Sequence, residues 1–278
     1  MGKTSIEWCH YTFNPWIGCT HVSPGCEHCY AEGLASRVGG TWVTKGWRPS
    51  GQAIERGKLA VWGQRTPRLF APGEYLQQPH AWNRAAESAG ERRRVFVASM
   101  ADPLELHADS AVARLQHEYR AQLWQLLKTT PALDWLLLTK RPENAKQLLP
   151  VGELPNLWLG VTAEDQRRVD ERIPILLQLP AVKRFVSYEP ALSAIELRPY
   201  LSGPSSSLEW IIAGAESGPR ARPADLDWFR SVRDQCTSAS VAFFLKQLIV
   251  NNKKRSTPAL DGERWTQVPQ SPLPVRAE

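Results

Sequence analysis

The stretch WLLLTKR, residues 135–141, places four apolar residues just before a lysine and an arginine. A short, unbroken apolar run is typical of a strand that is covered on both faces, as in a parallel sheet. The same pattern recurs in both directions along the chain. The expected strands are residues 95–99, 135–138, 158–161, 184–188, 210–213 and 241–245, with another within 6–17.

Helical patterns separate several of these runs. Residues 110–128 carry apolar side chains at helical spacing, and residues 223–235 and 30–38 are expected to be helical as well. Alternating strands and helices predict an α/β barrel or an open doubly wound sheet. We expect a single α/β domain over residues 1–255, an insertion at about 40–90, and a C-terminal tail over 256–278. Asp261–Gly262 marks a turn within that tail.

Charged and polar side chains directly follow the predicted strands. In α/β barrels the C-terminal ends of the strands build the active site. The pattern therefore predicts a site for a polar, ionic ligand at one rim of the sheet. The residues concerned are Asp102, Lys140, Arg141, Glu164, Asp165, Glu189, Glu216, Ser217, Lys246 and Gln247.

The chain has 278 residues and a net charge of +6, and its positive charge is concentrated in one segment. Residues 37–68 hold seven basic residues and one acid, which accounts for the whole excess. Trp42, Trp47 and Trp62 lie among these charges. The segment either contacts phosphates and stacks on bases, or is a solvated insertion whose tryptophans pack onto the barrel.

Neither a membrane span nor a signal peptide is expected. No apolar run approaches the roughly 18 residues that a membrane helix needs, and the N-terminal residues lack an apolar stretch. We therefore expect a cytoplasmic protein with no membrane partner, in which thiols stay reduced.

The segment GCTHVSPGCEHCYAEG, residues 18–33, brings three cysteines together: Cys19, Cys26 and Cys29. Clustered thiols in a cytosolic protein indicate metal ligation or redox chemistry. An iron–sulfur cluster on three cysteines leaves one iron open, whereas structural zinc needs a fourth ligand. The candidates for that fourth ligand are Cys9, His10, His21 and His28. The single C-x2-C pair favours the cluster. Cys9 is expected not to ligate, and Cys236 to be a buried helix residue.

Eight landmarks give the chain a family resemblance. It resembles a family of phage and bacterial proteins of unknown function with a three-cysteine motif (Gp37/Gp68-like). That family is distantly similar to radical S-adenosylmethionine (SAM) enzymes such as spore photoproduct lyase. The landmarks are SIEW (5–8), NPWIGCTHVSPGCEHCYAE (14–32), LLTKRPEN (137–144), LWLGVTAED (157–165), FVSYEP (185–190), IIAGAESGPRARP (211–223), FFLKQ (243–247) and DGERW (261–265).

The resemblance implies a partial (β/α)6-type, TIM-like barrel with a [4Fe–4S] cluster on Cys19, Cys26 and Cys29. SAM would bind the open iron and, after one-electron reduction, release a 5′-deoxyadenosyl radical. A reductant of the flavodoxin or ferredoxin type and a partner protein encoded nearby are also implied. The first cysteine interval differs, with six intervening residues instead of the usual three.

The resemblance also implies roles for rim residues. Glu164 and Glu189 would meet the ribose or amino group of SAM, and Gly214, Glu216 and Ser217 would line its adenosine side. Tyr30, next to the last cysteine, joins the cofactor-binding set. Lys140, Arg141 and Lys246 would meet anionic groups, and Asp102 would face the substrate.

The expected function is thus that of a radical SAM-type enzyme that modifies or repairs a nucleic acid or nucleotide. Asp102, Lys140 and Lys246 are the catalytic candidates. The alternative is a zinc-stabilised, non-catalytic phage protein that binds nucleic acid.

Overall fold

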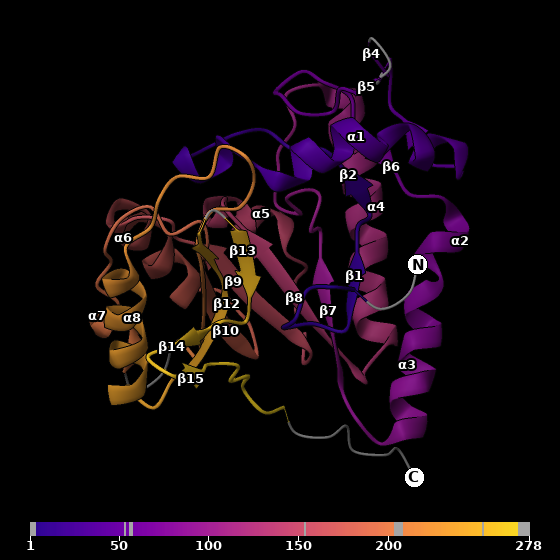
Figure 1. Ribbon diagram of the computed structural model, residues 1–278. Helices are drawn as coiled ribbons and strands as arrows, with labels where there is room; N and C mark the ends of the chain where they lie inside the picture. Colours follow the sequence, from indigo (N-terminus) through magenta and orange to yellow (C-terminus); the bar gives the residue numbers. More distant parts are fainter. Residues whose placement is uncertain are drawn as a thin grey trace.

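The computed structural model describes residues 4–52, 54–55, 58–152, 154–202, 208–251 and 253–271. Its centre is an eight-stranded sheet that curls into a half-barrel (Figure 1). Seven strands run parallel in chain order, and the eighth lies antiparallel at the edge. They are β1 (Tyr11–Phe13), β7 (Arg93–Val97), β8 (Leu133–Thr139), β9 (Leu157–Thr162), β10 (Lys183–Tyr188), β11 (Trp210–Gly214), β12 (Ala242–Val250) and β13 (Lys253–Ser256).

The expected strands are confirmed within a few residues, because their apolar side chains are buried on both faces of the sheet. Every residue of β9 and β11 is buried, as are six of the seven in β8. The parallel order places the C-terminal ends of β7 to β12 at one edge of the half-barrel. This is the edge at which the polar residues were expected to gather.

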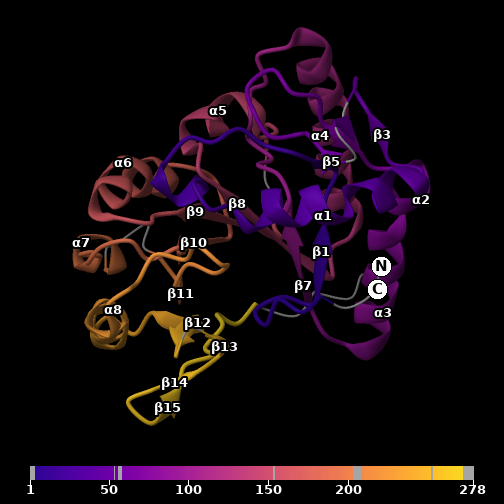
Figure 2. The same ribbon diagram turned by 45° about the horizontal axis from the view of Figure 1, so that its top comes forward.

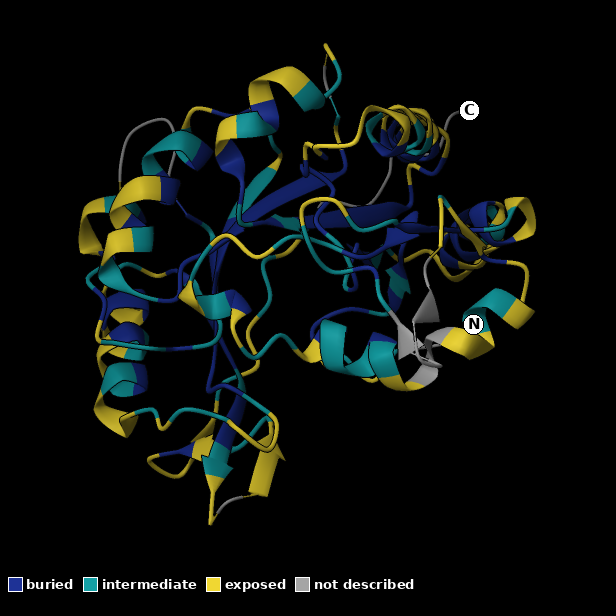
Figure 3. Ribbon diagram, turned by 90° about the horizontal axis from the view of Figure 1, so that it is seen from above, coloured by how far each residue is buried: buried dark blue, intermediate teal, exposed yellow. Residues whose placement is uncertain are grey.

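Helices cover the outer, convex face of the sheet (Figure 3). They are α3 (Gln78–Ala89), α4 (Ser110–Thr129), α5 (Ala145–Leu148), α6 (Gln166–Leu177), α7 (Arg198–Leu201) and α8 (Leu226–Ser238). Aspartates at 109, 165 and 225 cap α4, α6 and α8 by accepting backbone N–H groups. Asp165, expected at the rim, therefore serves as a helix cap. Among the described helices, none is both long and apolar enough to cross a membrane.

An aromatic layer fills the inner, concave face. Trp8, Phe96, Trp158, Phe185 and Trp210 belong to one buried cluster on this side of the sheet. The Trp8 and Trp210 rings meet edge to face at 6.0 Å. Because the segment before β1 supplies Trp8, part of this segment packs into the half-barrel interior.

The connection from β1 to β7 spans the C-terminal edge of the half-barrel. It contains 3-10 helix η1 (Pro24–Cys26) and α1 (Tyr30–Thr44), which lies across the top of the sheet (Figures 1 and 2). The helix expected over 30–38 thus continues to residue 44. The remaining elements are short: β2 (Trp16–Ile17), β3 (Arg48–Pro49), β4 (Ile54–Glu55), β5 (Lys58–Leu59), β6 (Leu69–Phe70) and α2 (Gly73–Leu76).

The expected C-terminal tail is partly folded against the sheet. Strands β14 (Ala259–Leu260) and β15 (Glu263–Arg264) form a hairpin whose turn residues, Asp261 and Gly262, both have positive φ. The turn is confirmed, but the domain extends beyond residue 255. Leu245 N donates to Trp265 O at 2.8 Å, and Leu260 is buried. Of the expected tail, residues 272–278 lie outside the described residues.

Gly160 on β9 generates a test of the inner packing. A Cβ built there would lie 2.4 Å from Phe185 Cζ, on a fully buried ring. Overpacking of this kind costs about 1–3 kcal/mol. We expect Gly160→Ala to lower the free energy of unfolding by that amount in urea denaturation. Gly73→Ala, where a Cβ meets nothing within 4 Å, is the control, and equal losses in the two variants would contradict the packing.

Candidate functional site

A cavity lies at the C-terminal edge of the half-barrel, beside the start of α1. It encloses about 1130 Å³, including the part open to solvent. Both the cysteine segment and the ends of β7, β8, β9, β10, β11 and β12 contribute to its lining. Of the expected site residues, Cys19, Cys26, Cys29, Tyr30, Asp102, Lys140, Glu189, Glu216, Ser217 and Lys246 line it, whereas Glu164 and Gly214 do not.

The three clustered cysteines are free thiols, and all three line this one cavity. Cys29 immediately precedes α1, whose first-turn backbone N–H groups act to lower the pKa of its thiol. Burial nevertheless raises the pKa of the Cys29 thiol. Within the described residues, no three His, Cys, Asp or Glu side chains are grouped so as to hold a single metal ion. The thiols therefore share a cavity without closing around one point.

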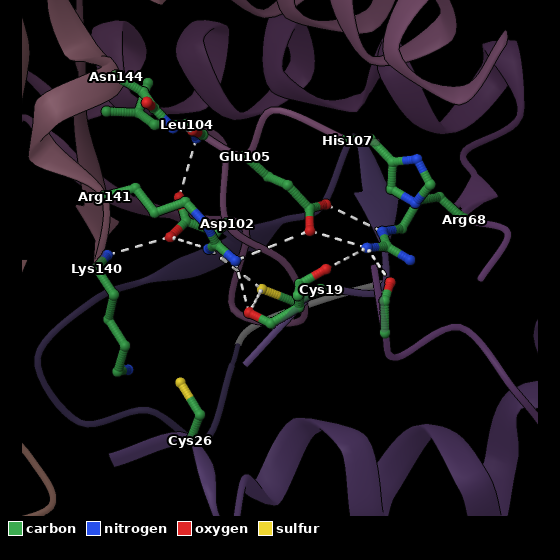
Figure 4. A network of polar contacts seen from close by, with 12 residues as sticks. Cys19, Cys26, Arg68, Asp102, Leu104, Glu105, His107, Lys140, Arg141 and Asn144 are labelled. Atoms are coloured by element: carbon green, nitrogen blue, oxygen red, sulfur yellow. Dashed lines mark hydrogen bonds and ion pairs between the residues drawn. The ribbon is translucent and has the colours of Figure 1, made fainter. Parts of the chain in front are cut away.

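Cys19 is held by a buried polar network (Figure 4). Arg141 donates from Nη1 to Cys19 Sγ at 3.5 Å and to Asp102 Oδ2 at 2.8 Å. Burial raises the pKa of the Cys19 thiol to about 12, although Arg141 opposes the rise. Asp102 also accepts from Thr139 Oγ1 at 2.8 Å and from the Lys140 backbone N–H at 3.1 Å. Both carboxylate oxygens are thus engaged by the protein, and Asp102 positions Arg141 rather than facing a substrate freely.

Arg68 extends this network and departs from its expected surface role. Its side chain is fully buried, and it pairs with Glu105 through bonds of 2.8 and 3.0 Å. Burial acts to raise the pKa of Glu105, but Arg68 outweighs it and lowers that pKa. Arg68 Nη2 also donates to Thr20 Oγ1 at 3.1 Å. The guanidinium therefore supports the cysteine segment and cannot contact a phosphate.

Glu164 anchors the cysteine segment from behind. It is completely buried, accepts from Arg172 Nη1 at 2.9 Å and accepts from the Gly25 backbone N–H at 3.2 Å. Burial alone would raise the pKa of Glu164, but the charges of Arg172 and Lys140 and a hydrogen bond from Ser23 together lower it. The residue expected to meet SAM instead fixes the loop between Cys19 and Cys26.

Glu216 and Arg222 form a second anchor for the same segment. Glu216 accepts from Arg222 Nε at 2.9 Å and from His28 Nδ1 at 3.0 Å. Arg222 also donates to Pro24 O at 2.9 Å and pairs with Glu27 at 2.9 Å. Burial acts to raise the pKa of Glu216, but these donors lower it to about 2. Glu216 lines the cavity, yet its carboxylate is committed to the loop.

Glu189 and Lys246 form an ion pair inside the cavity. Glu189 Oε1 lies 2.9 Å from Lys246 Nζ, but no donor is aligned to give this buried oxygen a hydrogen bond. Gly214 makes room for the pair, because a Cβ there would lie 2.6 Å from Glu189 Oε1. The space that a side chain at Gly214 would take is therefore occupied by the Glu189 carboxylate.

The expected fourth zinc ligands are engaged elsewhere. His21 Nε2 pairs with Glu32 at 2.8 Å, and His28 pairs with Glu216. His10 accepts a hydrogen bond from the Arg94 backbone N–H at 2.9 Å, and Cys9 belongs to the inner aromatic layer. Cys236 is fully buried on α8, which confirms the prediction that it is a buried helix residue.

The basic segment divides between interior and surface. Trp47 is buried and Trp42 packs against the core, as expected if the segment is a packed insertion. Trp62 lines the cavity. Its exposed cations are Arg37, Lys45, Arg48 and Arg65. Arg56 and the side chain of Lys58 lie outside the described residues.

Reasoning from the sequence missed the residues that hold the cysteine segment: Arg68, Glu105, Arg172 and Arg222. The sequence pattern does not set these four residues apart, because charged residues are common in loops and on helices. Arg222 lies within a family landmark, GPRARP (218–223), yet its partner Glu216 is six positions earlier. Only the fold shows that these pairs converge on one loop.

The fold and the cavity together define an α/β half-barrel protein with a cysteine-lined polar site at the C-terminal edge of its parallel strands. The family model described as "Protein of unknown function (DUF5131)" matches residues 3–269, and the chain belongs to that family. The match supplies neither the phage-protein name nor a radical SAM assignment. No curated protein and no solved structure matches the chain.

Arg222 provides a test of how the cysteine segment is held. Arg222→Gln removes the ion pair to Glu216 and the bond to Pro24 O, and hydrogen bonds to charged groups contribute about 1.5–3 kcal/mol. We expect amide hydrogen exchange across residues 18–29 to accelerate roughly tenfold or more. The control is Arg230→Gln on α8, which breaks an exposed ion pair with Asp261 in the turn between β14 and β15. An unchanged exchange rate in Arg222→Gln would show that the loop is held by other contacts.

Proposed function

We propose that this protein is a radical SAM-type iron–sulfur enzyme that acts on a nucleic acid or nucleotide. One observation carries the proposal: three free thiols from one short loop line the same cavity as polar side chains from the ends of six parallel strands. A cluster site and a substrate site would then be one space, as an enzyme requires and a simple electron carrier does not.

The residues present fit a [4Fe–4S] cluster on Cys19, Cys26 and Cys29. The three thiols are unpaired and line one cavity, while His21 and His28 each engage a carboxylate through one ring nitrogen. A cluster with three cysteine ligands keeps one iron open, where SAM can bind and accept an electron delivered by a flavodoxin- or ferredoxin-type reductant. Thiols with raised pKa values must lose protons on loading, so loading is favoured by higher pH.

The polar lining can orient a charged ligand. Glu189 Oε1 lies 2.9 Å from Lys246 Nζ, and this ion pair places both charges in the cavity lining, where they can meet polar groups of a ligand. Lys140 Nζ lies within ion-pair distance of no carboxylate among the described residues, and it suits an anionic group. Lys246 is held by Glu189, and Ser217 adds a hydroxyl at the end of β11.

The base of the cavity is apolar. Trp8, Phe96 and Leu138 line it beneath the polar rim, and Trp8 and Phe96 pack against each other at 4.6 Å. Trp8 adds a buried indole N–H without a hydrogen-bond partner to this apolar part of the lining. Such a surface excludes water from the reacting groups, which protects a reactive intermediate from side reactions.

The zinc-stabilised binding protein has less support. It needs four ligands around one ion, and within the described residues no three His, Cys, Asp or Glu side chains are grouped so as to hold one. The nucleic-acid part of the proposal rests on the exposed cations Arg37, Lys45 and Arg48 on or just after α1, which lies over the cavity edge. A positively charged surface there would attract the phosphates of a nucleic acid toward the opening of the cavity.

Replacement of single cysteines tests the cluster. After anaerobic reconstitution, the wild-type protein is expected to show broad, dithionite-bleachable visible absorbance and to convert SAM into 5′-deoxyadenosine. Cys19→Ala, Cys26→Ala and Cys29→Ala should each abolish both signals, because each removes one of three ligands. Cys9→Ala and Cys236→Ala, outside the cavity lining, should keep them. A wild-type protein with a full cluster and no 5′-deoxyadenosine would exclude the enzymatic proposal.

The salt dependence of binding tests the nucleic-acid substrate. The slope of log K against log salt should decrease by about 0.7–0.9 for each phosphate contact that is lost. We expect a variant combining Arg37→Gln, Lys45→Gln and Arg48→Gln to show this decrease in fluorescence-anisotropy titrations with single- and double-stranded DNA and RNA. Arg230→Gln on α8 is the matched loss of an exposed cation. An identical slope in wild type and triple variant would remove this surface from the proposal.

A further inference from the structure

Arg141 contacts one of the three cysteines directly. Its Nη1 donates to Cys19 Sγ at 3.5 Å, while its Nη2 donates to Thr20 O at 2.5 Å. Cys26 and Cys29 have no comparable arginine contact among the described residues. The three thiols therefore have different surroundings, and Cys19 alone faces a guanidinium.

The guanidinium is fixed in this position. Its side chain is only 7% exposed, and Asp102 Oδ2 binds it at 2.8 Å. Asp102 is itself held by Thr139 Oγ1 at 2.8 Å and by the Leu104 backbone N–H at 2.9 Å. These contacts of Asp102 orient the N–H that points at Cys19.

The network around Arg141 is balanced in charge. Arg68 and Arg141 are positive, Asp102 and Glu105 are negative, and all four are buried. Arg141 Nη2 lies 3.9 Å from Glu105 Oε1. The carboxylates of Asp102 and Glu105 lie beside the guanidinium and offset its charge. Cys19 Sγ therefore accepts a hydrogen bond from Arg141 within a network whose net charge is zero.

We propose that Arg141 is a positioning residue that raises the reduction potential of the cluster through its N–H···S hydrogen bond to Cys19. The inference rests on the proposed function and adds to it a device for tuning the electron transfer. A hydrogen bond to a ligand sulfur stabilises the reduced state, which carries more negative charge, over the oxidised state. The plain structural alternative is that Arg141 only ties Thr20 and Asp102 together.

The experiment is a redox titration of reconstituted protein, monitored by electron paramagnetic resonance. Arg141→Met removes both the donor and the charge, and leaves Asp102 unpaired. The double variant Asp102→Asn/Arg141→Met removes the donor but keeps the net charge of the network. Arg92→Gln breaks an Arg–Asp pair of the same kind, with a 2.7 Å contact, at the opposite edge of the sheet, and serves as the control.

We expect a lower midpoint potential in both Arg141 variants and an unchanged one in Arg92→Gln. Reduction should become roughly tenfold less favourable, which is a shift of about 59 mV for one electron. If the double variant takes up no cluster, Arg141→Lys serves in its place. Lysine keeps the positive charge, but its ammonium cannot donate to both Asp102 and Cys19 in the geometry of the planar guanidinium. A midpoint potential below that of the wild type is therefore expected again.

Three outcomes overturn the assignment. The first is a wild-type midpoint potential in Arg141→Met. The second is a wild-type midpoint potential in the double variant Asp102→Asn/Arg141→Met. The third applies if Arg141→Lys replaces the double variant, and it is a wild-type midpoint potential in Arg141→Lys. The second would mean that charge, and not the hydrogen bond, sets the potential. A cluster that reduces normally but yields no 5′-deoxyadenosine from SAM would instead refute the proposed function and leave this comparison valid.

Discussion

The rest of the site depends on buried ion pairs that hold the cysteine segment against the ends of the sheet. Arg141 binds it from the end of β8, the Glu164–Arg172 pair from beyond β9, and the Glu216–Arg222 pair from beyond β11. These attachments come from the ends of β8, β9 and β11, which belong to one sheet in the order β8-β9-β10-β11. The position of the loop therefore depends on the assembled sheet, and its three thiols line one cavity.

Burying so many charges is costly unless each is paired, and removal of one partner from a buried pair costs about 3–5 kcal/mol. The network around Asp102 and Arg141 meets this condition by alternating signs through to Arg68 and Glu105. Much of the polar rim thus serves to position the loop. What remains available to a ligand is a smaller set: the thiols, Lys140, the Glu189–Lys246 pair and Ser217.

The sequence was sufficient to predict the strands, the edge at which polar residues gather, and the buried position of Cys236, because apolar runs and helical periodicity are local signals. It was insufficient for roles that depend on partners. Glu164 and Lys140 both follow a strand and look alike in sequence. Only the fold shows that Glu164 faces Gly25 and Arg172, whereas Lys140 faces the cavity. Arg68 looked like a surface cation because its partner Glu105 is distant in sequence.

The central claim is that the three thiols hold an iron–sulfur cluster and leave one iron open to the cavity. Iron, acid-labile sulfide and zinc measured in protein purified without oxygen test it most directly. The account predicts iron and sulfide in equal amounts, with both lost from Cys26→Ala and no stoichiometric zinc. One zinc per chain with no labile sulfide would contradict it.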